Sequence, residues 1–113
     1  MLDGLINYLL SSEAEILRKN FVIRIVPMLN PDGVIYGNYR CSLLGVDLNR
    51  VWDRPNRLLH SSIFYSKKLI KHMNWERKVI LYCDFHGHSR KKNTFFYGCN
   101  FKNYEEDGRL KNA

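Results

Sequence analysis

Residues 21–29 (FVIRIVPML) are mostly apolar and rich in β-branched side chains, a composition typical of a strand buried on both faces of a helix-covered sheet. Residues 79–85 (VILYCDF) form a second run of this kind, and residues 94–97 predict a short third strand. The order strand, loop, helix, strand favours a right-handed parallel crossover. We therefore predict an α/β fold: part of a mixed, mainly parallel sheet with flanking helices.

Two helices are expected around these strands. Apolar residues recur at helical spacing from residue 2 to about residue 19, which predicts an amphipathic helix with a break near Ser11. A second helix is predicted to begin with Ser61 or Ser62 as its cap and to run to about Asn74. Its apolar residues are expected to face inward and three lysines outward, namely Lys67, Lys68 and Lys71.

The segment between the first strand and the second helix contains the strongest turn signal in the chain. Residues 30–33 (NPDG) combine a proline, which fixes φ, with a glycine, which accepts positive φ. Residues 34–57 then lose any regular pattern, and a long loop inside a compact domain is usually functional. We expect this loop to carry part of a binding site.

Length and composition indicate one ordinary globular domain over residues 1–113. The hydrophobic share is 45% and the charged share 26%, values that argue against disorder and rod-like folds. Neither a membrane span nor a secretory leader is recognisable, and Cys41, Cys83 and Cys99 show no paired spacing, so reduced thiols in a cytosolic chain are expected. A net charge of +7 would attract an acidic partner, or would only solvate the surface.

A histidine directly after the second predicted strand is a candidate metal ligand or base. In open α/β sheets, ligands bind beyond the carboxyl ends of the strands, and His86 lies there beside Gly87. If the strand stayed extended, Asp84, His86 and His88 would share one face and could form a small metal site. The alternative is that each histidine is a hydrogen-bonded structural residue.

Two arginines follow the first predicted strand at the same edge. Arg40 and Arg50 lie in the loop after the NPDG turn, and a guanidinium group binds a carboxylate or an oxyanion bidentately, which lysine cannot do. The alternative is a loop network in which both arginines pair with Asp32 or Asp47.

The combined motifs resemble those of the zinc carboxypeptidases of the carboxypeptidase A type, and specifically the cytosolic carboxypeptidases that trim glutamates from tubulin and other proteins. The resemblance rests on residues 26–52 (VPMLNPDGVIYGNYRCSLLGVDLNRVW) and residues 83–99 (CDFHGHSRKKNTFFYGC). They contain Asn-Pro-Asp-Gly, Gly-x-x-Arg, Asp-x-Asn-Arg and Asp-x-His-Gly-His in this order. The similarity extends over about residues 2–99.

The resemblance implies roles for four residues. His86 would be a zinc ligand, and Arg40 would polarise the scissile carbonyl and stabilise the oxyanion. Asn49 and Arg50 would hold the terminal carboxylate of the substrate. In this family the metal activates a water molecule while a glutamate acts as general base.

A catalytic zinc site needs three protein ligands, and none of the four histidines is followed by glutamate at the third position. The resemblance places the two other ligands, a His-x-x-Glu pair, upstream of Met1, and the general base after the last matched segment. We therefore expect residues 1–113 to be a partial catalytic domain, lacking its N-terminal and C-terminal parts and inactive alone.

The resemblance implies a zinc-dependent carboxypeptidase that removes C-terminal residues, above all glutamates, from tubulin or other acidic tails in the cytoplasm, in association with the cytoskeleton. Arg90, Lys91 and Lys92 would meet acidic side chains of such a tail, unless they form only a solvated turn. The alternative function is a non-catalytic remnant that binds acidic tails or a protein partner. Neither nucleic acid nor a membrane is expected as a partner, because a nucleic-acid binder would need aromatics and cations on one platform.

Overall fold

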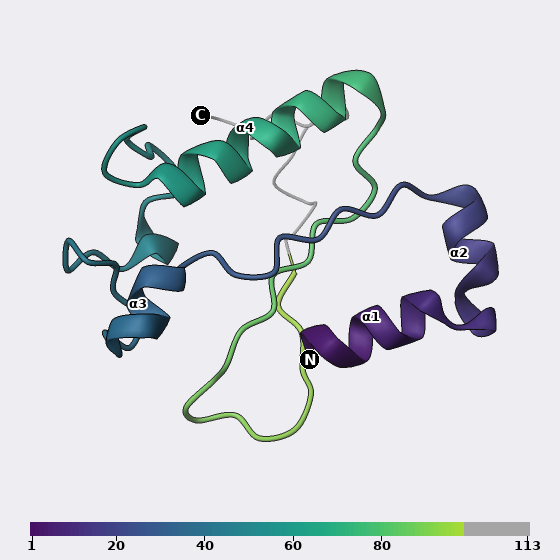
Figure 1. The fold of residues 1–113 in the computed structure, drawn as a ribbon, viewed down its shortest axis with the longest axis horizontal. Helices are drawn as coiled ribbons and strands as arrows, with labels where there is room; N and C mark the ends of the chain where they lie inside the picture. The colour runs from purple at the N-terminus through teal and green to yellow at the C-terminus, as the bar shows by residue number, and fades with distance from the viewer. Residues whose placement is uncertain (99–113) are drawn as a thin grey trace.

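The structure is a computed structural model, and it describes residues 1–98. Helices joined by turns and extended segments make up this part of the chain (Figure 1). In chain order they are α1 (Leu2–Leu10), the 3-10 turn η1 (Ser12–Ala14), α2 (Glu15–Asn20), α3 (Pro31–Tyr36), the 3-10 turn η2 (Leu48–Arg50) and α4 (Ser61–Glu76).

The first predicted helix forms, and it is interrupted at Ser11 as expected. The extended backbone of Ser11 (φ −71°, ψ 164°) ends α1, and η1 turns the chain so that Ala14 is fully buried. The Arg18 guanidinium donates from Nη1 to the carbonyl oxygens of Leu9 and Ser11. These carbonyls at the end of α1 have no partner within the helix, so Arg18 fastens α2 to α1.

The predicted sheet is wrong for the described residues. Residues 21–29, 79–85 and 94–97 contain no strand, and in residues 1–98 the β pairing is limited to one isolated antiparallel bridge between Cys41 and Asp47. β-Branched composition favours extended backbone, but a strand also needs a neighbouring backbone and a covered face. The predicted strands lack that cover: Val22 is 50% exposed and Leu81 is 79% exposed. A parallel crossover is therefore absent from this part of the chain.

The NPDG segment does more than turn the chain, because it begins helix α3. Asn30 is the N-cap, and its Oδ1 accepts from the Gly33 N–H at 3.1 Å, while Pro31 occupies the first helical position, where its missing N–H has no cost. Gly37 ends α3 with φ 72°, a left-handed conformation that glycine adopts without strain. The predicted loop 34–57 therefore contains the second half of α3 and all of η2.

The second predicted helix is confirmed as α4, and it extends two residues beyond the expected end. Neither serine caps it: His60 is the N-cap and makes no side-chain cap bond. Ile63 is buried, as expected for the inward face. Lys67 differs from the prediction, because it is half-buried rather than outward, while Lys68 and Lys71 are exposed.

Little of the described chain is buried. The buried hydrophobic residues are Ala14, Leu48 and Ile63, and Trp75 is 90% exposed. The fold is therefore held by local helices and polar side-chain contacts more than by a central core.

Two further expectations concern the state of the cysteines and the presence of a membrane-spanning segment. Cys41 and Cys83 are free thiols, as predicted, and Cys99 lies outside the described residues. Within residues 1–98, no helix has both the length and the apolar character required to cross a bilayer.

Candidate functional site

Asn30 ties the start of α3 to the loop that carries the first candidate arginine. Its Oδ1 caps Gly33, and its Nδ2 donates to the Cys41 carbonyl at 3.1 Å. Gly33 leaves room for this contact, because a Cβ there would clash with Asn30 Nδ2 and with the Cys41 carbonyl oxygen. This clamp, formed by Asn30, Gly33 and Cys41, places Arg40 at a fixed point beside α3.

A small turn then brings Asp47 back toward Arg40. The Ser42 N–H donates to the Val46 carbonyl at 2.9 Å, and Cys41 and Asp47 form the antiparallel bridge. Gly45 adopts φ 71° at the corner. Asp47 consequently lies across from Arg40 although the two residues are separated along the chain.

Asp47 is the centre of the candidate site. Its Oδ1 accepts from the Asn49 N–H at 3.0 Å, which caps η2. Its Oδ2 lies 3.7 Å from Arg40 Nη1 and 3.9 Å from Arg50 Nε. The structure thus brings Arg40, Asn49 and Arg50 around one carboxylate, and we call these four residues the Asp47 cluster. This is the loop network that was expected as the alternative to ligand binding by the arginines. Within residues 1–98, Asp32 makes no ion pair with them.

The charges in this cluster do not cancel. Two guanidinium groups surround one carboxylate, so within residues 1–98 one positive charge has no counter-charge. The side chains of Arg40 and Arg50 are 54% and 70% exposed, and exposed ion pairs of this length hold each other weakly. A second carboxylate from a ligand can therefore approach both arginines without displacing a buried partner.

Tyr39 supports Arg40 directly. Arg40 Nη2 donates to the Tyr39 hydroxyl at 3.2 Å, and its guanidinium carbon lies 4.9 Å from the centre of the Tyr39 ring. The tyrosine hydroxyl, followed by Asp47, raises the pKa of Arg40 above its ordinary value. Tyr39 has φ 56°, a left-handed conformation that is uncommon for a bulky residue, and strain of this kind is often found at functional sites.

The sequence-based prediction missed a contact that joins residues 30–53, the arginine loop, to α4. Lys67 Nζ donates to the carbonyl oxygens of Trp52 and Asp53, at 2.6 Å in both cases. A signal was present, since Lys67 follows the buried Ile63 by four residues and so shares its helix face.

His86 lies in the extended segment after α4 and is paired with Asp84. The distance from His86 Nε2 to Asp84 Oδ2 is 3.0 Å, and the imidazole is exposed rather than packed in the interior. A carboxylate that holds one ring nitrogen leaves the other free to bind a metal, an arrangement common among zinc-binding histidines. The chemistry of this pair therefore fits one zinc ligand.

The suggested site of Asp84, His86 and His88 is not formed. His88 Nδ1 accepts from the backbone N–H groups of Arg90 and Lys91, at 3.2 and 2.9 Å. No group of three metal-binding side chains occurs among residues 1–98. In the same part of the chain, no hydrogen bond or ion pair joins His86 to the Asp47 cluster.

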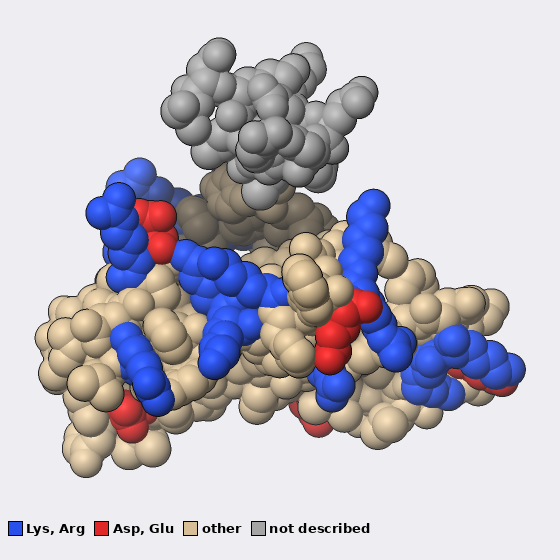
Figure 2. Space-filling view, turned by 90° about the horizontal axis from the view of Figure 1, so that it is seen from above, with Lys and Arg blue, Asp and Glu red and all other residues tan. Residues whose placement is uncertain are grey.

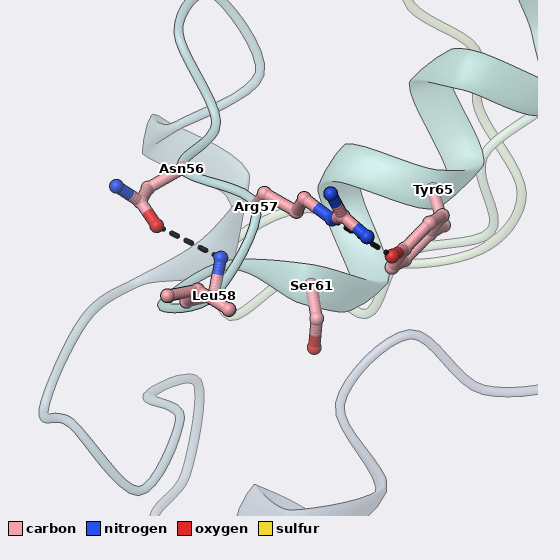
Figure 3. A pocket seen from close by; sticks show the side chains of 5 residues that line it. All are labelled: Asn56, Arg57, Leu58, Ser61 and Tyr65. Atoms are coloured by element: carbon pink, nitrogen blue, oxygen red, sulfur yellow. Dashed lines mark hydrogen bonds between the residues drawn. The ribbon is translucent and has the colours of Figure 1, made fainter.

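A hollow of about 580 Å³ lies beside the start of α4 (Figure 3). Arg57 and Tyr65 point toward each other across it, with Nε to hydroxyl at 3.2 Å. Asn56 Oδ1 accepts from the Leu58 N–H at 2.8 Å and fixes the turn before the helix. The hollow is lined by Asn56, Arg57, Leu58, Ser61 and Tyr65, so the predicted site residues do not belong to it.

Comparison with known proteins gives consistent matches. The zinc carboxypeptidase family matches residues 1–112. The chain is 50% identical over 105 residues to cytosolic carboxypeptidase 1 from Gallus gallus, covering 90% of the chain and 9% of that protein. It is 51% identical over 106 residues to cytosolic carboxypeptidase 2 from Xenopus tropicalis, covering 92% and 11%. No solved structure matches significantly. The chain spans about a tenth of the length of these relatives.

Proposed function

This chain belongs to the zinc carboxypeptidase family, and we propose that residues 1–113 are part of the catalytic domain of a zinc-dependent carboxypeptidase. The proposed reaction removes C-terminal residues, above all glutamates, from tubulin or other acidic protein tails. The observation that carries the proposal is the arrangement of Arg40, Asn49 and Arg50 around Asp47. Such a cluster is suited to recognising the free carboxylate at the end of a peptide.

Within the Asp47 cluster, different residues bind the substrate carboxylate and activate the scissile carbonyl. Arg50 and Asn49 bind the terminal carboxylate, since a guanidinium fork and an amide both donate hydrogen bonds in a fixed geometry. Arg40 donates to the carbonyl oxygen of the scissile bond, where negative charge develops in the transition state. Asp47 balances part of the positive charge and orients Asn49 through its backbone N–H.

His86 is proposed as one zinc ligand, with Asp84 holding the ring orientation through Nε2. The other two ligands, and the general-base glutamate, would come from parts of the protein outside this chain. A zinc ion bound there would polarise the substrate carbonyl and lower the pKa of a bound water molecule. On this basis residues 1–113 bind the substrate carboxylate but do not cleave alone.

Charge favours an acidic substrate. The chain carries +7, and lysine and arginine side chains outnumber acidic ones on the face shown in Figure 2. Arg90, Lys91 and Lys92 are proposed to meet glutamate side chains upstream of the cleaved bond. Lys91 Nζ already lies 4.5 Å from the Tyr97 ring centre, which holds this ammonium group in place. The proposed location is the cytoplasm, in line with the relatives' names, and association with the cytoskeleton is a further part of the proposal.

A second candidate function is binding of acidic tails without cleavage. It is favoured by the Asp47 cluster, which is complete within this chain, whereas residues 1–98 hold no three-ligand metal group. The two candidates share the carboxylate site and differ in whether the bound peptide is cleaved.

The test uses the longer protein that contains this chain, loaded with zinc, and a peptide ending in several glutamates. We expect release of glutamate from the free-acid peptide and none from its C-terminal amide, and we expect Arg40→Ala to reduce turnover by about 10²-fold or more. Binding of the free acid without release of glutamate would favour the second candidate. Equal binding and equal cleavage of the free-acid peptide and its amide would contradict both candidate functions.

A further inference from the structure

Lys67 and Trp52 together connect three parts of the molecule that are distant in sequence: α4, the residues after η2, and the segment that contains Tyr82. From the middle of α4 the Lys67 ammonium donates to the carbonyls of Trp52 and Asp53 at 2.6 Å. The Trp52 ring in turn packs edge-on against Tyr82, with ring centres 6.1 Å apart and planes at 72°. Lys67 therefore holds the backbone that follows η2, and the Trp52 ring connects that backbone to the segment that leads to His86.

The chemistry of this contact makes it a specific anchor. The two carbonyls belong to residues two and three positions beyond Arg50, the last residue of η2, and lie outside that turn. An ammonium group offers three donors, so Lys67 can donate to both carbonyl oxygens at the same time. Lys67 is half-buried, so water competes less for these bonds than at an exposed lysine.

We propose that Lys67 is a positioning residue for the carboxylate site. By holding the backbone of Trp52 and Asp53 on α4, it fixes the orientation of the preceding Asn49 and Arg50, and through the Trp52 ring it aligns that loop with Tyr82. This inference rests on the proposed function, because it assigns Lys67 to the same site. It adds a residue that touches neither substrate nor metal.

The chain offers a matched control in Lys71. Lys71 lies on the same helix, one turn further on, and is exposed. Replacing either lysine by methionine removes the same charge and leaves a side chain of good helix propensity. A difference between Lys67→Met and Lys71→Met therefore reports the contacts of Lys67 and not the net charge.

The first measurement follows Trp52 alone. The chain has two tryptophans, and Trp75 is 90% exposed, so Trp75→Phe leaves Trp52 as the single emitter. We expect Lys67→Met to shift its emission to longer wavelengths and to increase its quenching by iodide, with unchanged helix content by circular dichroism. Lys71→Met should leave both signals unchanged, and Lys67→Arg, which retains a cationic donor, should restore much of the native signal.

The second measurement is the dissociation constant for acetyl-Glu-Glu at constant ionic strength, with its C-terminal amide as the control ligand. We expect Lys67→Met to weaken binding roughly three- to tenfold and Lys71→Met by less than about twofold. In the longer zinc-loaded protein, Lys67→Met should raise KM and change kcat little, because the interaction lost is made equally in the ground and transition states.

The outcomes separate this inference from the proposed function. Unchanged Trp52 signals in Lys67→Met would overturn the anchor, and equal weakening by Lys67→Met and Lys71→Met would overturn the positioning role. If the unmutated chain bound the acid and the amide equally, the carboxylate site itself would fail. In that case the positioning role would fall with it, and the Trp52 signals would show whether the anchor exists independently.

Discussion

The arginine loop (residues 30–53) and the histidine segment (residues 79–98) differ in how they are held. In the arginine loop, hydrogen bonds between residues of the same loop fix the backbone, as at Asn30 and Asp47. The histidine segment is extended, and nearly all of its side chains are exposed. Contacts between residues close in sequence cost little chain entropy, whereas strand pairing needs distant partners. The residues of the Asp47 cluster are therefore already held in place within the arginine loop. The histidine segment contributes one candidate metal ligand, His86, whose ring is oriented by Asp84.

The largest effect is expected where the arginine loop is tightest. Gly33→Ala would place a Cβ against Asn30 and the Cys41 carbonyl, so the clamp must open, at a cost of about 1–3 kcal/mol. Faster amide hydrogen exchange at Gly33 and Val34 and weaker acetyl-Glu-Glu binding would show this.

Gly4→Ala is the control for the same chemical change. Nothing lies within 4 Å of a Cβ at Gly4, and alanine is the better helix former, so α1 should be stabilised by about 0.5–1 kcal/mol. Native exchange rates in Gly33→Ala would show that the loop is not held by this clamp.

Two substitutions at Asp47 separate its role in orienting the Asn49 N–H from the effect of its negative charge. Asp47→Ala removes the cap of η2 and should cost about 1 kcal/mol of local stability, with weaker acetyl-Glu-Glu binding. Asp47→Asn keeps an oxygen that can accept from the Asn49 N–H but removes the competing carboxylate, so binding should strengthen at low salt. Titration of both variants by calorimetry tests the pair, and equal binding by the two would contradict the role given to Asp47.

Tyr82 provides a test in the histidine segment. Partial burial of the half-exposed ring, then the charges of Asp84 and Cys83, raise the pKa of Tyr82 above its ordinary value of 10.0. The folded state therefore holds the phenol proton more tightly than the unfolded state. The resulting stabilisation is fully present below pH 10 and is lost as pH rises through the folded pKa. Ultraviolet difference titration should show late ionisation of one tyrosine, and Tyr82→Phe should abolish this component.

The smallest effect is expected from the exposed face of the histidine segment. Leu81 is 79% exposed, so Leu81→Ser should change the free energy of unfolding by less than about 0.5 kcal/mol. Urea denaturation followed by circular dichroism would measure it. A loss of several kcal/mol would mean that this segment is covered, and would remove the contrast with the arginine loop.

Features that depend on neighbouring residues could be predicted from the sequence. Helical periodicity located the break at Ser11 and the course of α4. The alternative that the arginines pair with Asp32 or Asp47 anticipated the contact with Asp47 but did not choose between the two acids. The strands were wrong because β-branched runs indicate an extended backbone but not whether a partner is present. Lys67 was assigned to solvent because its partners, the Trp52 and Asp53 carbonyls, belong to another part of the chain. The grouping of His88 with His86 failed because the His88 ring bonds to its own loop.

The most direct test of the carboxylate site is a nuclear magnetic resonance titration of the chain with acetyl-Glu-Glu and with its C-terminal amide. We predict saturable shifts of the Arg40 and Arg50 side-chain Nε–H signals and of the Asn49 amide with the free acid, and far smaller shifts with the amide. Equal responses to both ligands, or shifts confined to lysines and arginines outside the Asp47 cluster, would contradict the assignment.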